Sequence, residues 1–301
     1  MATEEQEDAG VHKDAGARNQ TLLTLGWFLG LTTLFAGAAY YFVIEHGLRR
    51  YYVSLLMWTP ALAALLTCRI RSVDFAALGW HWPTGRWIVA GYLLPVLYGA
   101  AAYAIIWGGG FGGLIDPKFV KEVSYFLGLA DWSQGATIAF GIFMFGTVGM
   151  IWHAATALGE EIGWRGFLTP TLMRVTSFPL ASLAVGAVWA LWHLPIIVWT
   201  KYNAGPNDLE LQFLNYSLMT VGMSFILTYL RVRSGSLWPA VILHASHNIY
   251  VLTIMQPMTI QYKETWRYAS EFGFILPLVI LAVGLYFWRR YEGEEKAAAA
   301  V

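Results

Sequence analysis

Three charged residues interrupt an apolar stretch of the sequence, at Glu160, Glu161 and Arg165. The apolar residues continue past them to Pro170, so a long helix rather than a loop is expected here. At bilayer depth each unpaired charge costs roughly 2.5–3.5 kcal/mol. The cluster is therefore expected to be paired, hydrated or used for chemistry.

Helical spacing gives the two carboxylates different tasks. Glu161 and Arg165 are four residues apart and share a face, with the carboxylate on the N-terminal side, the better order for an ion pair. Successive helix residues point about 100° apart, which leaves Glu160 to face a cavity as a general base. The alternative is a structural ion pair with one solvated carboxylate near a membrane face.

Two further polar motifs stand in other apolar segments. In the first, Trp189 precedes His193 by four residues, so the indole can pack beside the imidazole and orient it. In the second, His244 and Asn248 share a face, with His247 offset from it; a histidine and an amide can donate two hydrogen bonds to one oxyanion. Each motif alone fits polar packing between helices equally well.

Burying three polar sites in a bilayer costs less free energy if the three sites meet in one cavity. Together they supply an acid/base, an ion pair, an imidazole and an amide, and this set fits hydrolysis by an activated water. A nucleophilic side chain is not indicated, because Ser246 lies off the His244 face and the single cysteine, Cys68, stands among apolar residues.

The composition predicts the scaffold that must hold these motifs. Of 301 residues, 57% are hydrophobic and only 13% are charged, against about 25% charged in soluble domains. The many aromatic residues fit interfacial belts, and a net charge of zero offers no basic field for nucleic acid. We expect an all-α polytopic membrane protein with about eight transmembrane helices around an intramembrane polar cavity, at residues 22–44, 51–68, 87–107, 138–160 and onward, 180–200, 210–230, 237–255 and 271–288.

The remaining segments are expected to lie outside the spans. Residues 1–21 and 289–301 are predicted to be cytoplasmic tails, the first disordered, on either side of a transmembrane domain at 22–288. Residues 117–129 have the pattern of a short interfacial helix. Lys and Arg number eleven on the side of the termini and seven on the other side, which predicts that both termini are cytoplasmic.

The motifs also resemble those of a known family. Glu-Glu-x-x-x-Arg at 160–165, aromatic-x-x-x-His at 189–193 and His-x-x-x-Asn at 244–248 are similar to the motifs of the CPBP (ABI) family. That family includes type II CAAX prenyl endopeptidases and bacterial immunity-associated proteins. The resemblance covers about residues 135–255 and the eight-span layout. Trp189 departs from the usual Phe but keeps the aromatic ring.

The resemblance implies a glutamate-dependent intramembrane endopeptidase. Glu160 and His193 would activate the attacking water, and His244 with Asn248 would form the oxyanion hole. Supporting positions are Glu161, Arg165, Trp189 and His247. The substrate would be a peptide or lipidated protein in the bilayer, and the eukaryotic members of the family cleave prenylated substrates. The scissile bond would be presented from the cytoplasmic leaflet.

Two alternatives stay open from the sequence. Glu160, His193 and His244 could hold a zinc ion with an open position for water, although a metal-free mechanism without a cofactor is favoured. The chain could also be a non-catalytic immunity or scaffold protein of the membrane. The sequence does not define the oligomeric state.

Overall fold

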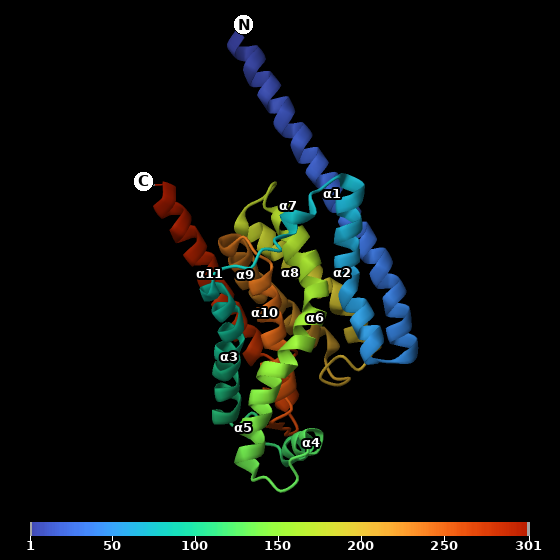
Figure 1. The fold of residues 1–301 in the computed structure, drawn as a ribbon, viewed down its shortest axis with the longest axis vertical. Helices are drawn as coiled ribbons and strands as arrows, with labels where there is room; N and C mark the ends of the chain where they lie inside the picture. The colour runs from blue at the N-terminus through green and yellow to red at the C-terminus, as the bar shows by residue number, and fades with distance from the viewer. Residues whose placement is uncertain (1, 300–301) are drawn as a thin grey trace.

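The computed structural model describes residues 2–299, with side chains from residue 16 onward, and consists almost wholly of helices (Figure 1). Helices satisfy their own backbone hydrogen bonds, as the apolar composition demands in a bilayer. The elements are α1 (Ala2–His46), α2 (Arg50–Arg71), η1 (Phe75–Leu78), α3 (Gly85–Gly108), β1 (Gly113–Leu114), α4 (Pro117–Leu127), α5 (Gln134–Met144), η2 (Phe145–Gly149), α6 (Met150–Glu161), η3 (Ile162–Leu168), α7 (Thr169–Leu172), α8 (Phe178–Trp199), α9 (Leu209–Ser234), α10 (Trp238–His247), η4 (Asn248–Met255), β2 (Thr259–Ile260), η5 (Thr265–Arg267) and α11 (Ile275–Ala299).

The expected spans are present as helices. Within the described chain, six helices are long and apolar enough to cross a membrane: Gly16–His46, Arg50–Arg71, Gly85–Gly108, Gln134–Leu172, Phe178–Trp199 and Leu209–Ser234. The two other expected spans are also helical, in α10 with η4 and in α11. This architecture confirms the all-α polytopic membrane class.

The tails differ from the sequence-based expectation. α1 begins at Ala2, so a helix occupies the segment predicted to be disordered, and α11 continues to Ala299. Extending a helix that an apolar span has already nucleated costs little, because nucleation is the expensive step. The Arg71 side chain also donates to the side chains of Gln20 and Thr24 and holds this part of α1 against α2. Residues 1, 300 and 301 lie outside the described chain.

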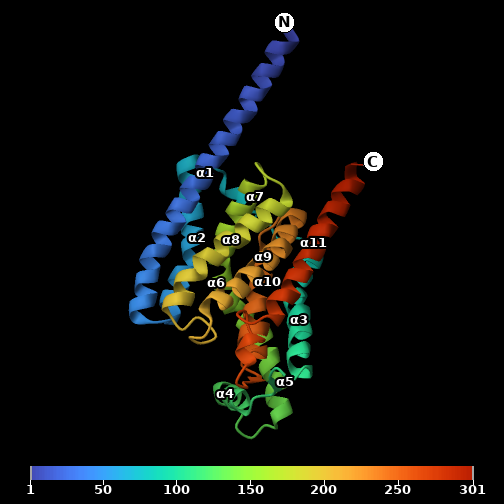
Figure 2. The same cartoon turned by 180° about the vertical axis from the view of Figure 1, so that it is seen from behind.

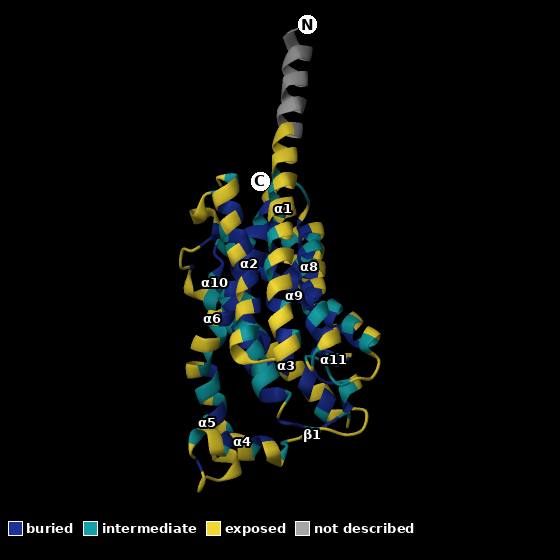
Figure 3. Ribbon diagram, turned by 90° about the vertical axis from the view of Figure 1, so that its right-hand side faces the viewer, coloured by how far each residue is buried: buried dark blue, intermediate teal, exposed yellow. Residues whose placement is uncertain are grey.

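The long fourth span lies between neighbouring helices. α6 packs against α2 and α10, while α8 packs against α9 and α9 against α11 (Figures 1 and 2). Buried residues fill the interior of this bundle, and the outer helices present exposed faces (Figure 3). Gly159 and Gly163 both lie directly against α2, on one face as their spacing predicts.

Two π-helical turns adjoin the polar motifs. η3 begins directly after Glu161, and η4 begins at Asn248. π-turns are uncommon and are frequent at functional sites, since they rotate the side chains that follow relative to a regular α-helix. They change which residues face the interior, and the sequence pattern did not reveal them.

The predicted short helix is α4, within the expected range of 117–129. Phe119 and Val123 are buried on one side of it, whereas Lys118 and Glu122 are exposed. A two-stranded antiparallel pair anchors the preceding loop, with Gly113 of β1 opposite Ile260 of β2. The helical prediction is therefore confirmed, while its location at a membrane interface stays a prediction.

Candidate active site

The structure brings the residues of the three motifs around one cavity. Glu160 from α6, His193 from α8, His244 from α10 and Asn248 at the start of η4 all line a cavity of about 220 Å³ inside the bundle. Glu160 is 1% exposed, His244 5% and His193 7%. Residues separated by more than 80 positions in the sequence therefore share one enclosed space.

The predicted ion pair is present and has a third member. Arg165 Nη1 lies 3.1 Å from Glu161 Oε1, and both side chains are fully buried. His244 donates its Nδ1–H to the same Glu161 oxygen, at 2.9 Å. The Arg165 guanidinium also lies 4.5 Å from the centre of the Trp189 ring. Glu161 is thus occupied in fixing Arg165 and His244, and its supporting role in catalysis stays a prediction.

Glu160 is held differently, by two indole N–H groups. Trp189 Nε1 donates to Glu160 Oε2 at 2.7 Å, and Trp164 Nε1 lies 3.4 Å from the same oxygen. Among the described residues no hydrogen bond is formed by Oε1, and Glu160 lines the cavity. One carboxylate oxygen is therefore fixed, and the other is left for a molecule in the cavity.

His193 is oriented by the backbone and by aromatic rings. Its Nδ1 lies 3.0 Å from the carbonyl oxygen of Trp189, so Nδ1 carries the proton and donates it. The Trp192 and Tyr216 rings lie 4.7 and 5.0 Å from the imidazole, centre to centre. The expected packing of Trp189 beside the imidazole is present as an edge contact at 6.1 Å. His193 Nε2 remains available as a proton acceptor.

The structure adds a carboxylate that the sequence interpretation did not identify as a site residue. Glu271 is 4% exposed and lines the same cavity. It accepts hydrogen bonds from His247 Nε2 at 3.1 Å and from the Tyr202 hydroxyl at 3.3 Å. The Tyr98 hydroxyl lies 2.8 Å from His247 Nδ1, so both ring nitrogens of His247 have partners.

The position of Glu271 explains why it was missed. It stands at the first residue of the expected last span, where a charge looks like an ordinary boundary residue. Burial and the negative charge of Glu271 raise the pKa of Tyr202 well above its ordinary value, so the hydroxyl stays protonated and donates. Treating Glu271 as a fourth charge at membrane depth would have found it.

The zinc alternative requires several side chains directed at one metal position. The described residues contain no group of three or more His, Cys, Asp or Glu side chains placed to hold a metal ion. His244 directs Nδ1 toward Glu161, and His193 directs Nδ1 toward a carbonyl oxygen. Because metal-bound histidines commonly donate their other ring N–H to a carboxylate or a carbonyl oxygen, these contacts do not exclude a metal, and metal dependence stays a prediction for experiment.

The cavity lies toward the end of the bundle away from the termini. Its lining includes Leu48 in the turn between α1 and α2, and Tyr202 in the loop after α8. Both chain ends are at the opposite end (Figure 1). The remaining wall is largely apolar, with Val43, Leu56, Met57, Met219 and Met223. The space therefore combines a polar side with a side suited to apolar groups.

Comparison with known proteins identifies the same segment. Residues 143–250, which contain all three motifs, match the model of the family described as type II CAAX prenyl endopeptidase Rce1-like. A 93-residue stretch is 32% identical to CAAX prenyl protease 2 of Methanococcus maripaludis. The aligned part covers 30% of this chain and 34% of that protein, about a third of each. The family match confirms the resemblance to the CPBP proteases over the motif-bearing segment.

Proposed function

We propose that this protein is an intramembrane endopeptidase in which Glu160 activates a water molecule for attack on a peptide bond. One observation carries the proposal: Glu160, His193, His244 and Asn248, from three separate helical segments, line a single buried cavity. Such a cavity collects an acid/base, an imidazole and an amide donor where a substrate carbonyl can enter.

The attack begins with a proton transfer from water. Glu160 Oε1 accepts the proton, and the hydroxide adds to the carbonyl carbon of the substrate. The two indoles on Oε2 keep the carboxylate oriented during this step. His193 Nε2, which the hydrogen bond of Nδ1 leaves unprotonated, assists as a second acceptor of the water protons.

The negative oxygen of the tetrahedral intermediate needs donors. Asn248 supplies its amide N–H, and His244 supplies Nε2–H. Because Nδ1–H of His244 is bound to Glu161, a donating Nε2 requires the doubly protonated imidazolium. The buried carboxylates of Glu160 and Glu161 and the guanidinium of Arg165 together carry one net negative charge. A protonated His244 balances this charge.

Collapse of the intermediate completes the reaction. The C–N bond breaks, and Glu160 returns the proton to the leaving nitrogen, so the products are a carboxylate and an amine. The relative named CAAX prenyl protease 2 leads us to propose a lipidated protein or peptide as substrate. The apolar wall of the cavity is compatible with such a substrate.

The test is cleavage of a panel of prenylated and unprenylated peptides by the purified protein. Glu160→Ala is expected to lower the rate on the order of 100- to 10,000-fold, the usual contribution of a general base, while the protein stays folded. Glu122→Gln, at an exposed carboxylate on α4, serves as the control and should cleave at the wild-type rate. Undiminished cleavage by Glu160→Ala would reject the mechanism.

The same assay with a chelator addresses the metal alternative. Retained cleavage after metal removal is expected for the metal-free mechanism, and loss that zinc restores would overturn it. The scaffold alternative is tested in cells with Glu160→Gln and His193→Ala. If both variants keep full biological function, a non-catalytic role replaces the enzymatic one.

A further inference from the structure

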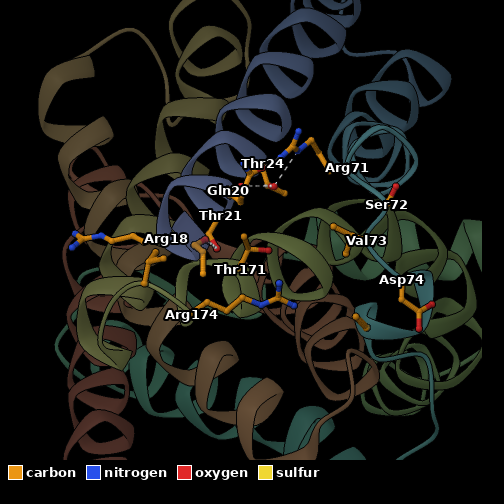
Figure 4. Close-up of a pocket in the computed structure, with 13 residues that line it drawn as sticks. Arg18, Gln20, Thr21, Thr24, Arg71, Ser72, Val73, Asp74, Thr171 and Arg174 are labelled. Carbon is orange, nitrogen blue, oxygen red and sulfur yellow. Dashed lines mark hydrogen bonds between the residues drawn. The ribbon is translucent and has the colours of Figure 1, made fainter. Parts of the chain in front are cut away.

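A second cavity lies at the other end of the molecule, near the two termini. It has a volume of about 890 Å³ and lies between α1, the segment after α2, and α7 (Figure 4). We name it the arginine pocket after three of its lining residues, Arg18, Arg71 and Arg174. None of the polar motifs described above contributes to it.

The arginine pocket is located where three spans end. Arg71 is the last residue of α2, and Arg174 follows α7 at the end of the fourth span. Arg18 precedes the first apolar run, which begins at Leu22. In a bilayer these three ends lie at the boundary between hydrocarbon and headgroups, so the pocket opens at headgroup level.

Charge and hydroxyl groups dominate its lining. The lining residues include three arginines and one carboxylate, Asp74, which already accepts the backbone N–H of Ala76 at 2.9 Å. Figure 4 shows Arg71 and Arg174 on opposite sides, with Thr21 and Thr171 between them. The Arg18 guanidinium points away from the other two in the same view. The pocket therefore has a positive balance, concentrated at two facing arginines.

Arg71 is held in place before any ligand arrives. Its Nε lies 3.3 Å from Thr24 Oγ1, and a terminal nitrogen donates to the side chain of Gln20. Arg71 is half-buried and lines the pocket, and among the described residues its guanidinium forms no other hydrogen bond. A fixed guanidinium loses little freedom when it binds an anion.

We propose that the arginine pocket binds a phosphate ester, supplied by the headgroup of an anionic membrane phospholipid. Guanidinium groups bind phosphate oxygens with paired, charge-assisted hydrogen bonds. Basic pockets at the ends of transmembrane helices are suited to anionic headgroups, which concentrate in the cytoplasmic leaflet. The predicted cytoplasmic location of the termini places the pocket in that leaflet.

The proposal is tested by lipid binding to the full-length protein in detergent, measured by native mass spectrometry. The probes are phosphatidylglycerol and phosphatidylcholine of matched acyl chains. Wild-type protein is expected to prefer phosphatidylglycerol, and each of Arg71→Gln and Arg174→Gln should weaken that binding about 5-fold. Arg69→Gln, an exposed arginine of α2 outside the pocket, is the matched control and should bind as wild type.

Further arms separate the outcomes. Arg174→Gln replaces an exposed side chain and should fold normally. The Arg174→Gln variant therefore still tests the proposal if Arg71→Gln fails to fold. Glycerol 3-phosphate and inorganic phosphate are compared by the shift in melting temperature. A shift with these anions, and no preference among lipids, would keep the phosphate site but replace the lipid by a soluble ester. Equal retention of both lipids without any shift from the soluble anions, or unchanged binding by Arg174→Gln, would overturn the proposal.

Discussion

Trp189 has a task in this protein that a phenylalanine at the same position could not perform. Its indole N–H donates to Glu160 at 2.7 Å, and its ring covers His244 at 5.3 Å and the Arg165 guanidinium at 4.5 Å. The first contact needs the N–H, whereas the other two need only an aromatic face. The Phe that is usual at this position in the CPBP family, which the motif-bearing segment resembles, could not form this hydrogen bond to the proposed base.

Trp189→Phe separates these two contributions. The ring and its packing remain, but a hydrogen bond to a buried carboxylate is lost, and such bonds contribute about 1.5–3 kcal/mol. We expect cleavage to fall on the order of 10-fold or more through kcat, and the melting temperature to fall by a few degrees because the same bond contributes to stability. Phe at position 164 in place of Trp is the comparison, because that N–H is farther away, at 3.4 Å. A larger loss in Trp164→Phe would contradict this reading of the geometry.

Glu271 provides a second test at the level of single residues. Glu271→Ala leaves the buried Nε2–H of His247 without its acceptor, and an unpaired buried donor costs about 1–3 kcal/mol. Tyr202→Phe removes only a donor at 3.3 Å and keeps the ring beside His193. Thermal unfolding in detergent should rank Glu271→Ala below Tyr202→Phe, and Tyr202→Phe close to wild type. The reverse order would show that the carboxylate does not organise this side of the cavity.

At the scale of helices, the sequence predicted what depends on local spacing. The span positions follow from apolar runs, and the Glu161–Arg165 pair follows from a four-residue separation within one helix. The contacts of Glu161 with His244 and of Glu160 with Trp189 depend on how different helices pack against one another. The spacing of residues within a single helix does not predict such contacts. The π-turn at η3 and the burial of Glu271 were not predicted from the sequence for the same reason.

Packing of the fourth span on α2 depends on the absence of side chains. A Cβ at Gly163 would lie 2.9 Å from the backbone carbonyl of Pro60, and one at Gly159 would lie 2.7 Å from the Met57 carbonyl oxygen. Gly163→Ala must therefore push α2 away, and overpacking of this kind costs about 1–3 kcal/mol. We expect a lower melting temperature and reduced cleavage, because α6, which packs on α2, carries Glu160.

A control for this prediction is available in α1. An added Cβ at Gly37 meets nothing within 4 Å, so Gly37→Ala should be neutral or slightly stabilising. Equal melting temperatures for Gly163→Ala and Gly37→Ala would show that close approach to α2 is not required. A loss confined to Gly163→Ala would tie the shape of the active cavity to this helix contact.

For the whole molecule, the positions of the cavity and of the termini constrain one another. Both chain ends lie at one end of the bundle, with the arginine pocket, while the cavity lined by Glu160 reaches the α1–α2 turn at the other end (Figures 1 and 2). The distribution of Lys and Arg predicts cytoplasmic termini, which would direct the cavity end away from the cytoplasm. That orientation conflicts with a scissile bond presented from the cytoplasmic leaflet, so the two expectations cannot both hold if substrate enters at this end.

Cysteine labelling decides between them, because Cys68, the single native cysteine, is 1% exposed and gives little background. Ala76→Cys introduces an exposed thiol next to Ala77 of the arginine pocket, which lies at the end that carries the termini. Glu122→Cys introduces one on α4, at the opposite end (Figure 1). With cytoplasmic termini, a membrane-impermeant maleimide added to intact cells should label Glu122→Cys and spare Ala76→Cys until the membrane is permeabilised. The opposite pattern would refute the charge-based orientation, place the active cavity toward the cytoplasm, and move the proposed phospholipid to the outer leaflet. Labelling of both thiols or of neither in intact cells would contradict the location of these two segments on opposite sides of the bilayer.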